Sequence, residues 1–427
     1  MVFKFESLTT REGCKNVRLR IAMSNIKKID GGVTAPMGFS ASGVHAGIKG
    51  KGTKPDIALI VSGKVAAIAG TFTTNKIQGA HVKLCKQRLA GRQARAIVVN
   101  SGCANACTGP EGLADAERMA GIVARQINAD EKHIFVCSTG TIGMPLPMDR
   151  IETGIVMAAQ SLSDAGGAVA ARAIMTTDTV DKQVAVEFKV DNRIVRVGGM
   201  AKGAGMIEPN MATMLAFLTT DAAVEPKALQ KCLSAAVQSS FNRVTVDGDQ
   251  SCNDTVLLMA NGAADNHPLD EKHTDWKLFA NAVNDVAQEL AIKIAKDGEG
   301  ATKFVTVAVA GATTDTDASK ASRAVANSLL VKTSWFGGDP NWGRVIDAVG
   351  YSGAEVKEEL VDISYDELAA VKGGRANPAA LIKDLEKILA KKSFTLNIDL
   401  HLGKGSDTVY TCDCSEEYVR INSEYMT

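Results

Sequence analysis

The feature that most constrains the fold is a change of character in the middle of the chain, at Thr213. Residues 202–212 contain glycines and a proline, which predicts a loop rather than regular structure. Residues 214–219 are apolar or β-branched, which predicts a buried strand. Thr213 is therefore expected at the mouth of a strand, directly after the small residue Ala212.

A threonine at this place has two interpretations. The simpler one is a residue that opens a strand, and the local pattern alone favours it. The other is a nucleophile, because a cut directly before Thr213 would free an α-amine that can take the proton of its own hydroxyl. Such an amine titrates near pH ~8, so it could act as a base at neutral pH.

Composition narrows the class of protein. The chain has 427 residues, 45% of them apolar, which is enough for the core of two or three domains. Because 48 basic residues balance 48 acidic ones, we expect neither nucleic acid nor a membrane surface as a partner. No apolar run reaches the ~20 residues of a membrane span. Residues 1–30 have no secretory signal, although their arginines and lysines leave an organellar presequence open.

Cysteine, histidine and glycine patterns predict no metal and no nucleotide. The nine cysteines are odd in number and widely spread, which favours a reducing compartment. The pairs Cys103/Cys107 and Cys412/Cys414 lack zinc-site spacing, and the histidines are scattered. The glycine-rich residues 31–52 contain neither a complete GxGxxG nor a Walker motif.

Strands and helices alternate on both sides of Thr213, so each half is expected to supply sheet and helix layers. No low-complexity linker divides the chain. Strands are predicted at 56–62, 64–73, 94–100, 134–137, 183–190, 193–197, 214–219, 243–246, 304–310, 394–400 and 408–412. Helices are predicted at 111–128, 151–162, 226–239, 276–296, 319–331 and 377–391, with Asp339 capping a further one.

Two polar loops stand out among these elements. Residues 138–143, rich in Ser, Thr and Gly, could offer free backbone N–H groups or simply cap the next helix. Glu299 lies between two glycines, and the plain interpretation is a solvated carboxylate in a turn.

The run KGAGMIEPNMATMLAFLTTDA, from Lys202, resembles the self-cleavage segment of the ornithine acetyltransferase family. These are the bifunctional glutamate N-acetyltransferases of arginine biosynthesis. Further blocks resemble the family in the same order, and they include VNSGCANACTG, CSTGTIGMPLPMD, MTTDT, DGDQSCNDT, DGEGATK, GDPNWGR and YVRINSEYMT. The likeness covers residues 31–427 and leaves residues 1–30 as an extension of unknown role.

The resemblance implies an α+β fold, the αββα sandwich of the aminopeptidase DmpA, which resembles N-terminal-nucleophile hydrolases. It implies self-cleavage between Ala212 and Thr213. The products would be an α chain (31–212) and a β chain (213–427) that form one intertwined catalytic body. The family further implies assembly of these chains into a heterotetramer or larger.

The resemblance also assigns roles to single residues. Thr213 matches the nucleophile, and Thr139 with Gly140 matches the oxyanion pair. The substrate-binding positions are matched by Thr176, Lys202, Thr213, Glu299, Asn422 and Thr427. The neighbouring Thr177 leaves the register of Thr176 open.

The activity implied is transfer of an acetyl group from N-acetylornithine to glutamate, without metal or cofactor. Acetyl-CoA as a second donor stays open. The implied location is the cytoplasm, or the mitochondrial matrix in a eukaryote. Two alternatives are an N-terminal-nucleophile amidohydrolase or aminopeptidase, which would pass the acyl group to water, and a processed but inactive binding protein.

Overall fold

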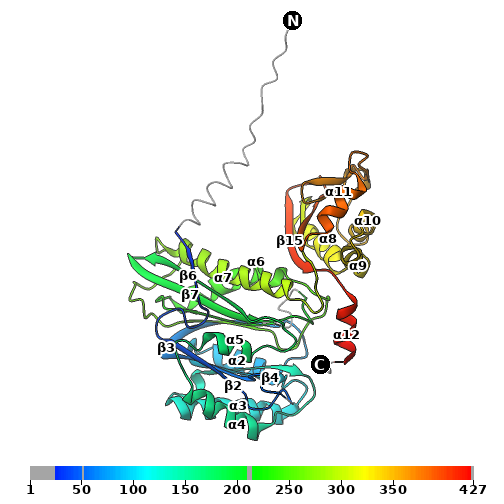
Figure 1. The fold of residues 1–427 in the computed structure, drawn as a ribbon. Coiled ribbons are helices and arrows are strands. Elements are labelled where there is room, and N and C mark those ends of the chain that lie inside the picture. Colours follow the sequence, from blue (N-terminus) through cyan, green and yellow to red (C-terminus); the bar gives the residue numbers. More distant parts are fainter. Residues whose placement is uncertain (1–24, 51, 209–213, 425–427) are drawn as a thin grey trace.

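Two β-sheets carry the fold in the computed structural model, which describes residues 25–50, 52–208 and 214–424 (Figure 1). Ala212, Thr213 and Thr427 lie outside the described residues. The first sheet runs in the order β1 (Lys27–Ile29), β6 (Lys182–Val190), β7 (Arg193–Lys202), β8 (Leu215–Thr220), β9 (Thr255–Ala260), β3 (Ile57–Phe72), β4 (Gln93–Cys103) and β5 (Ile134–Thr141), with β2 (Phe39–Val44) also paired to β3.

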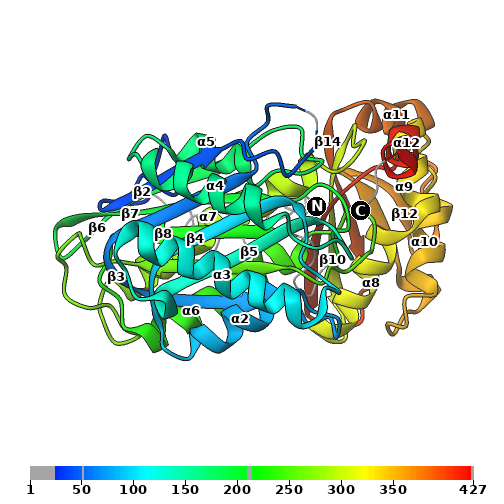
Figure 2. The ribbon, with the colours of Figure 1, turned by 90° about the horizontal axis from the view of Figure 1, so that it is seen from below.

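The first sheet folds over into two packed layers. Along each strand, alternate side chains face the interior between the layers or the helices outside. In β8, Leu215 and Phe217 face the interior between the layers, where Ile97 and Val99 of β4 meet them. The opposite face of β8 packs on α6 (Pro226–Ser239) and α7 (Trp276–Lys296). The opposite face of β4 packs on α3 (Gly109–Ile127) and α4 (Met148–Gln160), the side seen in Figure 2. The result is the αββα sandwich that the resemblance implies.

Strand β3 belongs to both layers. Its first residues pair with β2 and β4, whereas its last six pair with β9. The pairing to β4 shifts register between Val61 and Ala66. The prediction of two strands separated by a turn at Ser62 was therefore wrong, because the chain bends within one long strand.

Smaller elements of the sandwich complete its layers. They are α2 (Ala80–Leu89), α5 (Gly167–Ala173) and the short helices η1 (Glu131–His133) and η2 (Phe241–Arg243). The predicted hairpin of β6 and β7 is confirmed, and both of its turn residues, Asp191 and Asn192, have positive φ angles (49° and 63°).

The second sheet lies beside the sandwich and has its own core around Trp335, Tyr365 and Leu396 (Figure 1). Its strand order is β13 (Arg375–Ala376), β12 (Leu368–Lys372), β11 (Asp362–Tyr365), β14 (Ser393–Asp399), β10 (Phe304–Ala312) and β15 (Gly405–Cys412). Its helices are α8 (Asp315–Asn327), α9 (Leu329–Gly337), α10 (Trp342–Gly350), η3 (Glu358–Leu360) and α11 (Ile382–Leu389), and α12 (Glu416–Glu424) follows.

Several predicted elements differ from the structure. The helix expected at 319–331 is two helices, because Ser328 has extended backbone and caps α9. Asn341, not Asp339, caps α10, since its side chain accepts the N–H of Arg344. The strand expected at 243–246 is a 3₁₀ turn followed by one isolated bridge from Val244 to Tyr410. Strand β9 was missed, as were β11 to β13.

In the described part, no helix has the length and apolar character needed to cross a bilayer.

The expected cut falls between two paired strands, β7 and β8, which run side by side from Val197↔Thr220 to Lys202↔Leu215. We therefore predict that the two chains produced by cleavage remain bound and unfold together, because separation would expose both strands' apolar faces. Size-exclusion chromatography and calorimetry measure this. Halves that are separately soluble and folded would contradict the prediction.

Candidate active site

The described residues singled out in the sequence line one cavity of about 190 Å³. They come from distant parts of the chain and are Thr139, Gly140, Thr176, Lys202, Glu299 and Asn422. Thr177 lines the same cavity, so the choice between it and Thr176 stays open. Their roles are taken up below as part of the proposal.

The end of β5 shapes one wall of the cavity. The strand continues through residues expected to be a loop, so Gly140 pairs with Gly102 of β4. A Cβ on Gly140, whose φ is +128°, would lie 2.4 Å from the carbonyl carbon of Gly102. Only glycine fits there, and the tight packing fixes the backbone beside Thr139.

Lys202, at the end of β7, reaches across to the other layer of the sandwich. Its Nζ donates to Oγ1 of Thr139 at 3.4 Å, and both side chains are buried. A hydroxyl that accepts from an ammonium keeps its own hydrogen for another acceptor, so Thr139 can donate into the cavity. Burial lowers the pKa of Lys202, and the nearby Asp178 carboxylate opposes this shift.

A buried charge network stands behind Lys202. Lys182 pairs with Asp178 at 2.7 Å and with Asp297 at 2.5 Å, all three nearly inaccessible to solvent. Burial alone would raise the pKa of Asp178, but the charges of Lys182 and Lys202 and the N–H of Gly203 lower it to about 2. Asp178 is therefore ionised at neutral pH, and together with Asp297 it offsets the charges of the two lysines.

Glu299 is a buried carboxylate, not the solvated turn residue of the plain interpretation. Only 7% of its surface is exposed, and its Oε2 accepts Nδ2 of Asn422 at 2.7 Å. A Cβ on Gly205 would lie within about 2.5 Å of this carboxylate, so glycine makes the room. Asn422 comes from α12, which follows the second sheet (Figure 1), and it lines the same cavity.

Three polar residues of the segment 247–254, which the sequence analysis gave no role, organise the surroundings of the cavity. Asn253 donates through Nδ2 to the carbonyls of Ala104 and Ser138, at 2.6 and 2.8 Å. Asp247 and Asp254 accept backbone N–H groups, as described below. Their only sequence signal is a group of Asp and Asn residues directly before the apolar run of β9.

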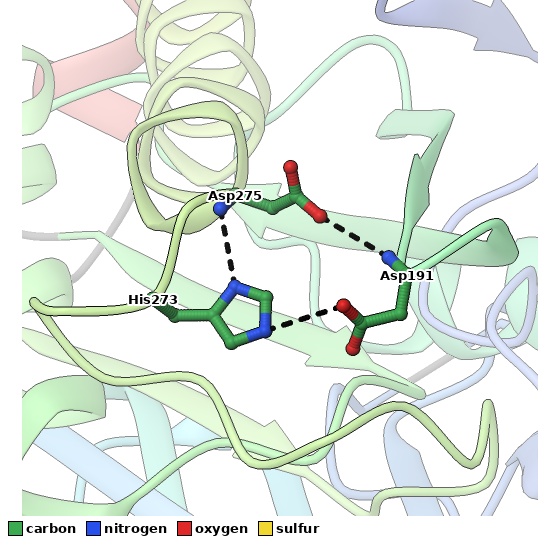
Figure 3. A group of neighbouring side chains, drawn as sticks. All are labelled: Asp191, His273 and Asp275. Atoms are coloured by element: carbon green, nitrogen blue, oxygen red, sulfur yellow. Dashed lines mark hydrogen bonds and ion pairs between the residues drawn. The ribbon is translucent and has the colours of Figure 1, made fainter.

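A histidine and two aspartates form a separate cluster away from the cavity (Figure 3). Nδ1 of His273 accepts the backbone N–H of Asp275 at 3.1 Å, which leaves the ring proton on Nε2, facing Asp191. A metal on Nε2 would require the proton on Nδ1, where the N–H of Asp275 already points. The cluster instead ties the β6–β7 turn to the start of α7.

Comparison with known proteins gives one consistent result. The model of the ArgJ family matches residues 40–427. The arginine biosynthesis bifunctional protein ArgJ of Geobacter sulfurreducens is 50% identical over 390 residues, covering 91% of this chain and 99% of that protein. The glutamate N-acetyltransferase of Methanocaldococcus jannaschii is 46% identical over 413 residues, covering 94% and 100%. A crystal structure of the Mycobacterium tuberculosis ornithine acetyltransferase with ornithine aligns at 41% identity and a TM-score of 0.40, covering 43% of this chain and 98% of that one.

The charge network predicts a pH-dependent stability. Because the pKa of Asp178 lies below the ordinary value of roughly 3.9, its contribution is complete above about pH 5 and fades as the pH falls toward 2. Asp178→Asn should lower the free energy of unfolding by about 3 kcal/mol at pH 7 and by roughly half as much at pH 3, where the unfolded chain is mostly protonated at this position.

Urea unfolding at both pH values measures this difference. The exposed Asp265→Asn serves as the control and should change stability by no more than about 0.5 kcal/mol. A loss for Asp178→Asn that is the same at both pH values would refute the electrostatic explanation.

Proposed function

The chain belongs to the ArgJ family, and we propose that it moves the acetyl group of N-acetylornithine to glutamate. The observation that carries the proposal is one small cavity that joins the Lys202–Thr139 contact to the Glu299–Asn422 contact. Lys202, which lines the cavity at the end of β7, pairs with Leu215 of β8, and Leu215 follows Thr213 by two residues in the sequence.

The charges of the cavity suit amino acids. Lys202 can bind a carboxylate and Glu299 an ammonium, and Asn422 adds an amide to the same wall. N-acetylornithine and glutamate both carry an α-carboxylate, and each presents a nitrogen that is acetylated or free. A cavity of about 190 Å³ is smaller than the roughly 300–1,000 Å³ of sites for larger ligands, in keeping with such substrates.

The proposed reaction has two half-reactions. The Thr213 hydroxyl attacks the acetyl carbonyl, a C–O bond forms, the amide C–N bond breaks, and the hydroxyl proton passes through the α-amine to the leaving ornithine nitrogen. The amine of glutamate then attacks the acetyl ester and restores the hydroxyl. Thr139 and the N–H of Gly140 are the proposed donors to the oxyanion, where one donor contributes about 3–4 kcal/mol.

Self-cleavage would use the same hydroxyl. Its attack on the carbonyl of Ala212 forms an ester and breaks the peptide C–N bond, which frees the Thr213 amine, and water then hydrolyses the ester to the Ala212 carboxylate and the Thr213 hydroxyl. We propose that the resulting α and β chains assemble into a heterotetramer or larger. We propose a cytoplasmic location, which fits the free thiols of the cysteines in the described residues.

An acetyl-transfer assay tests the function. Purified protein is incubated with N-acetylornithine, with and without glutamate, and ornithine, N-acetylglutamate and acetate are quantified. We expect N-acetylglutamate only when glutamate is present. Acetate formed without glutamate would instead identify an amidohydrolase. If no product forms, the processed but inactive binding protein is the remaining interpretation. Acetyl-CoA as the donor in a parallel reaction tests bifunctionality.

Self-cleavage gives a prediction of its own. Intact-mass measurement of the wild type should show two chains that meet between Ala212 and Thr213, and Thr213→Ala should give only the full-length chain. Thr219→Ala is the control for removing a threonine from the same strand, and it should still be cut. Full-length wild type after native purification would count against the proposal.

Glu299 should matter for transfer but not for cleavage. Glu299→Gln keeps the volume and removes the charge, and loss of a charged hydrogen bond of roughly 1.5–3 kcal/mol predicts a kcat/KM lower by about 10- to 100-fold. Cleavage at Ala212 should persist. Glu187→Gln, on strand β6 and outside the lining of the cavity, is the control. Wild-type kinetics in cut Glu299→Gln would remove Glu299 from the substrate site.

A further inference from the structure

One segment, residues 247–254, contacts the chain on both sides of the stretch 209–213. It begins four residues after the end of η2 and ends directly before β9, and Asp247 and Asp254 are its first and last residues. Each carboxylate accepts backbone N–H groups from a different flank. These contacts join parts of the chain that are about 40 residues apart in sequence.

Asp247 binds the flank that precedes the stretch. Its Oδ2 accepts the N–H of Met206 at 2.6 Å, and its Oδ1 accepts the N–H of Ile207 at 2.9 Å. The N–H of Val246 donates to the carbonyl of Ile207 at 2.8 Å, and the Ile207 side chain is buried in the core. The Tyr418 hydroxyl adds a bond to Oδ2 at 3.3 Å. The N–H of Ile207 is thus bound by Asp247, and the carbonyl of Ile207 by the adjacent Val246.

Asp254 binds the flank that follows the stretch. Its Oδ1 accepts the N–H of Met214 at 2.9 Å, and the next N–H, of Thr255, donates to the carbonyl of Met214 at 3.2 Å. From there Leu215 pairs with Thr255 as β8 and β9 run parallel. Met214 is therefore fixed before the strand begins.

The two carboxylates are bound differently. Asp247 receives four donors, and burial nevertheless raises its pKa to about 6. Asp254 is wholly buried, and its Oδ2 has no hydrogen-bond partner among the described residues. Holding Met214 needs only one acceptor oxygen, which an amide also supplies, whereas holding Met206 and Ile207 uses both oxygens of Asp247.

We propose that Asp247 and Asp254 are positioning residues for self-cleavage, which fix the two flanks of the bond by accepting their backbone N–H groups. The inference rests on the proposed function, because it concerns the attack of Thr213 on Ala212. Fixing both flanks raises the fraction of molecules in which the Thr213 hydroxyl is positioned to attack the Ala212 carbonyl. Such pre-orientation accelerates an intramolecular reaction. The two residues act through the backbone and need not touch the reacting atoms.

Alanine and asparagine variants separate this role from others. Asp247→Ala and Asp254→Ala remove the acceptors, and each should slow cleavage by about 10- to 100-fold. Asp254→Asn keeps one acceptor oxygen and should cleave within about threefold of wild type. Asp247→Asn keeps one of the two acceptor oxygens, so one of the two backbone N–H groups loses its partner. Its cleavage rate should therefore lie between those of Asp247→Ala and the wild type.

Asp221 is the matched control. It lies at the other end of β8, is buried, and accepts the N–H groups of Arg196 and Met37 at 2.8 and 2.9 Å. Asp221→Ala should therefore lower the melting temperature to a similar extent but leave the cleavage rate within about threefold of wild type.

The experiment follows cleavage after cell-free synthesis, with samples quenched at intervals and the full-length chain separated from its two products. Melting temperatures of the purified variants show which are folded. Slow cleavage in the folded alanine variants, rescue in Asp254→Asn and a normal rate in Asp221→Ala support the proposal. Wild-type rates in Asp247→Ala and Asp254→Ala, or equal slowing in Asp221→Ala, overturn it.

The two positions can be judged independently. If one alanine variant does not fold, the other still decides, together with its asparagine variant. Wild-type protein that stays full-length would instead overturn the self-cleavage of the proposed function, a result distinct from failure of the positioning role.

Discussion

The antiparallel pairing of β7 with β8 is the constraint on which the site depends. Because Lys202 pairs with Leu215, β7 ends and β8 begins at the same end of the sheet. That end is also where β5 stops, so Lys202 of one layer meets Thr139 of the other. The pairing therefore holds Lys202 and Leu215, which precede and follow the predicted cleavage site in the sequence, at the edge of the sheet where Lys202 contacts the Thr139 hydroxyl.

Buried charge is the second organising feature, and its balance is local. Lys182 and Lys202 would be strongly destabilising in a dry interior, but Asp178 and Asp297 lie within ion-pair distance of Lys182, and Asp178 also lies near Lys202. The same carboxylate accepts the N–H of Gly203, so the network also fixes the backbone where β7 ends. Asp178 therefore has two roles: it offsets the charge of the buried lysines, and it fixes the backbone at Gly203.

The sequence predicted those elements that depend on short-range residue patterns, such as amphipathic helices and tight turns. The amphipathic helices α6 and α7 were predicted with the bounds that the structure has, and the Asp191–Asn192 turn followed from its residue types. The bend of β3 depends on partners far along the chain, so no local signal revealed it, and the apolar run of β9 became recognisable as a strand only from its pairing with β3 and β8. The cavity residues were found through family resemblance. The burial of Glu299 and the contacts of Asp247 and Asp254 arise only when distant segments meet.

The position of Asn422 on the last helix has a consequence for the order of events during synthesis. Glu299 accepts the amide of Asn422 from α12, which follows the second sheet in the chain, so this contact forms only after residues 416–424 have been translated. The sandwich strands that precede it can pair much earlier, since domains fold as they emerge. A growing chain would thus have a folded sandwich before the wall of the cavity that contains Glu299 and Asn422 is complete.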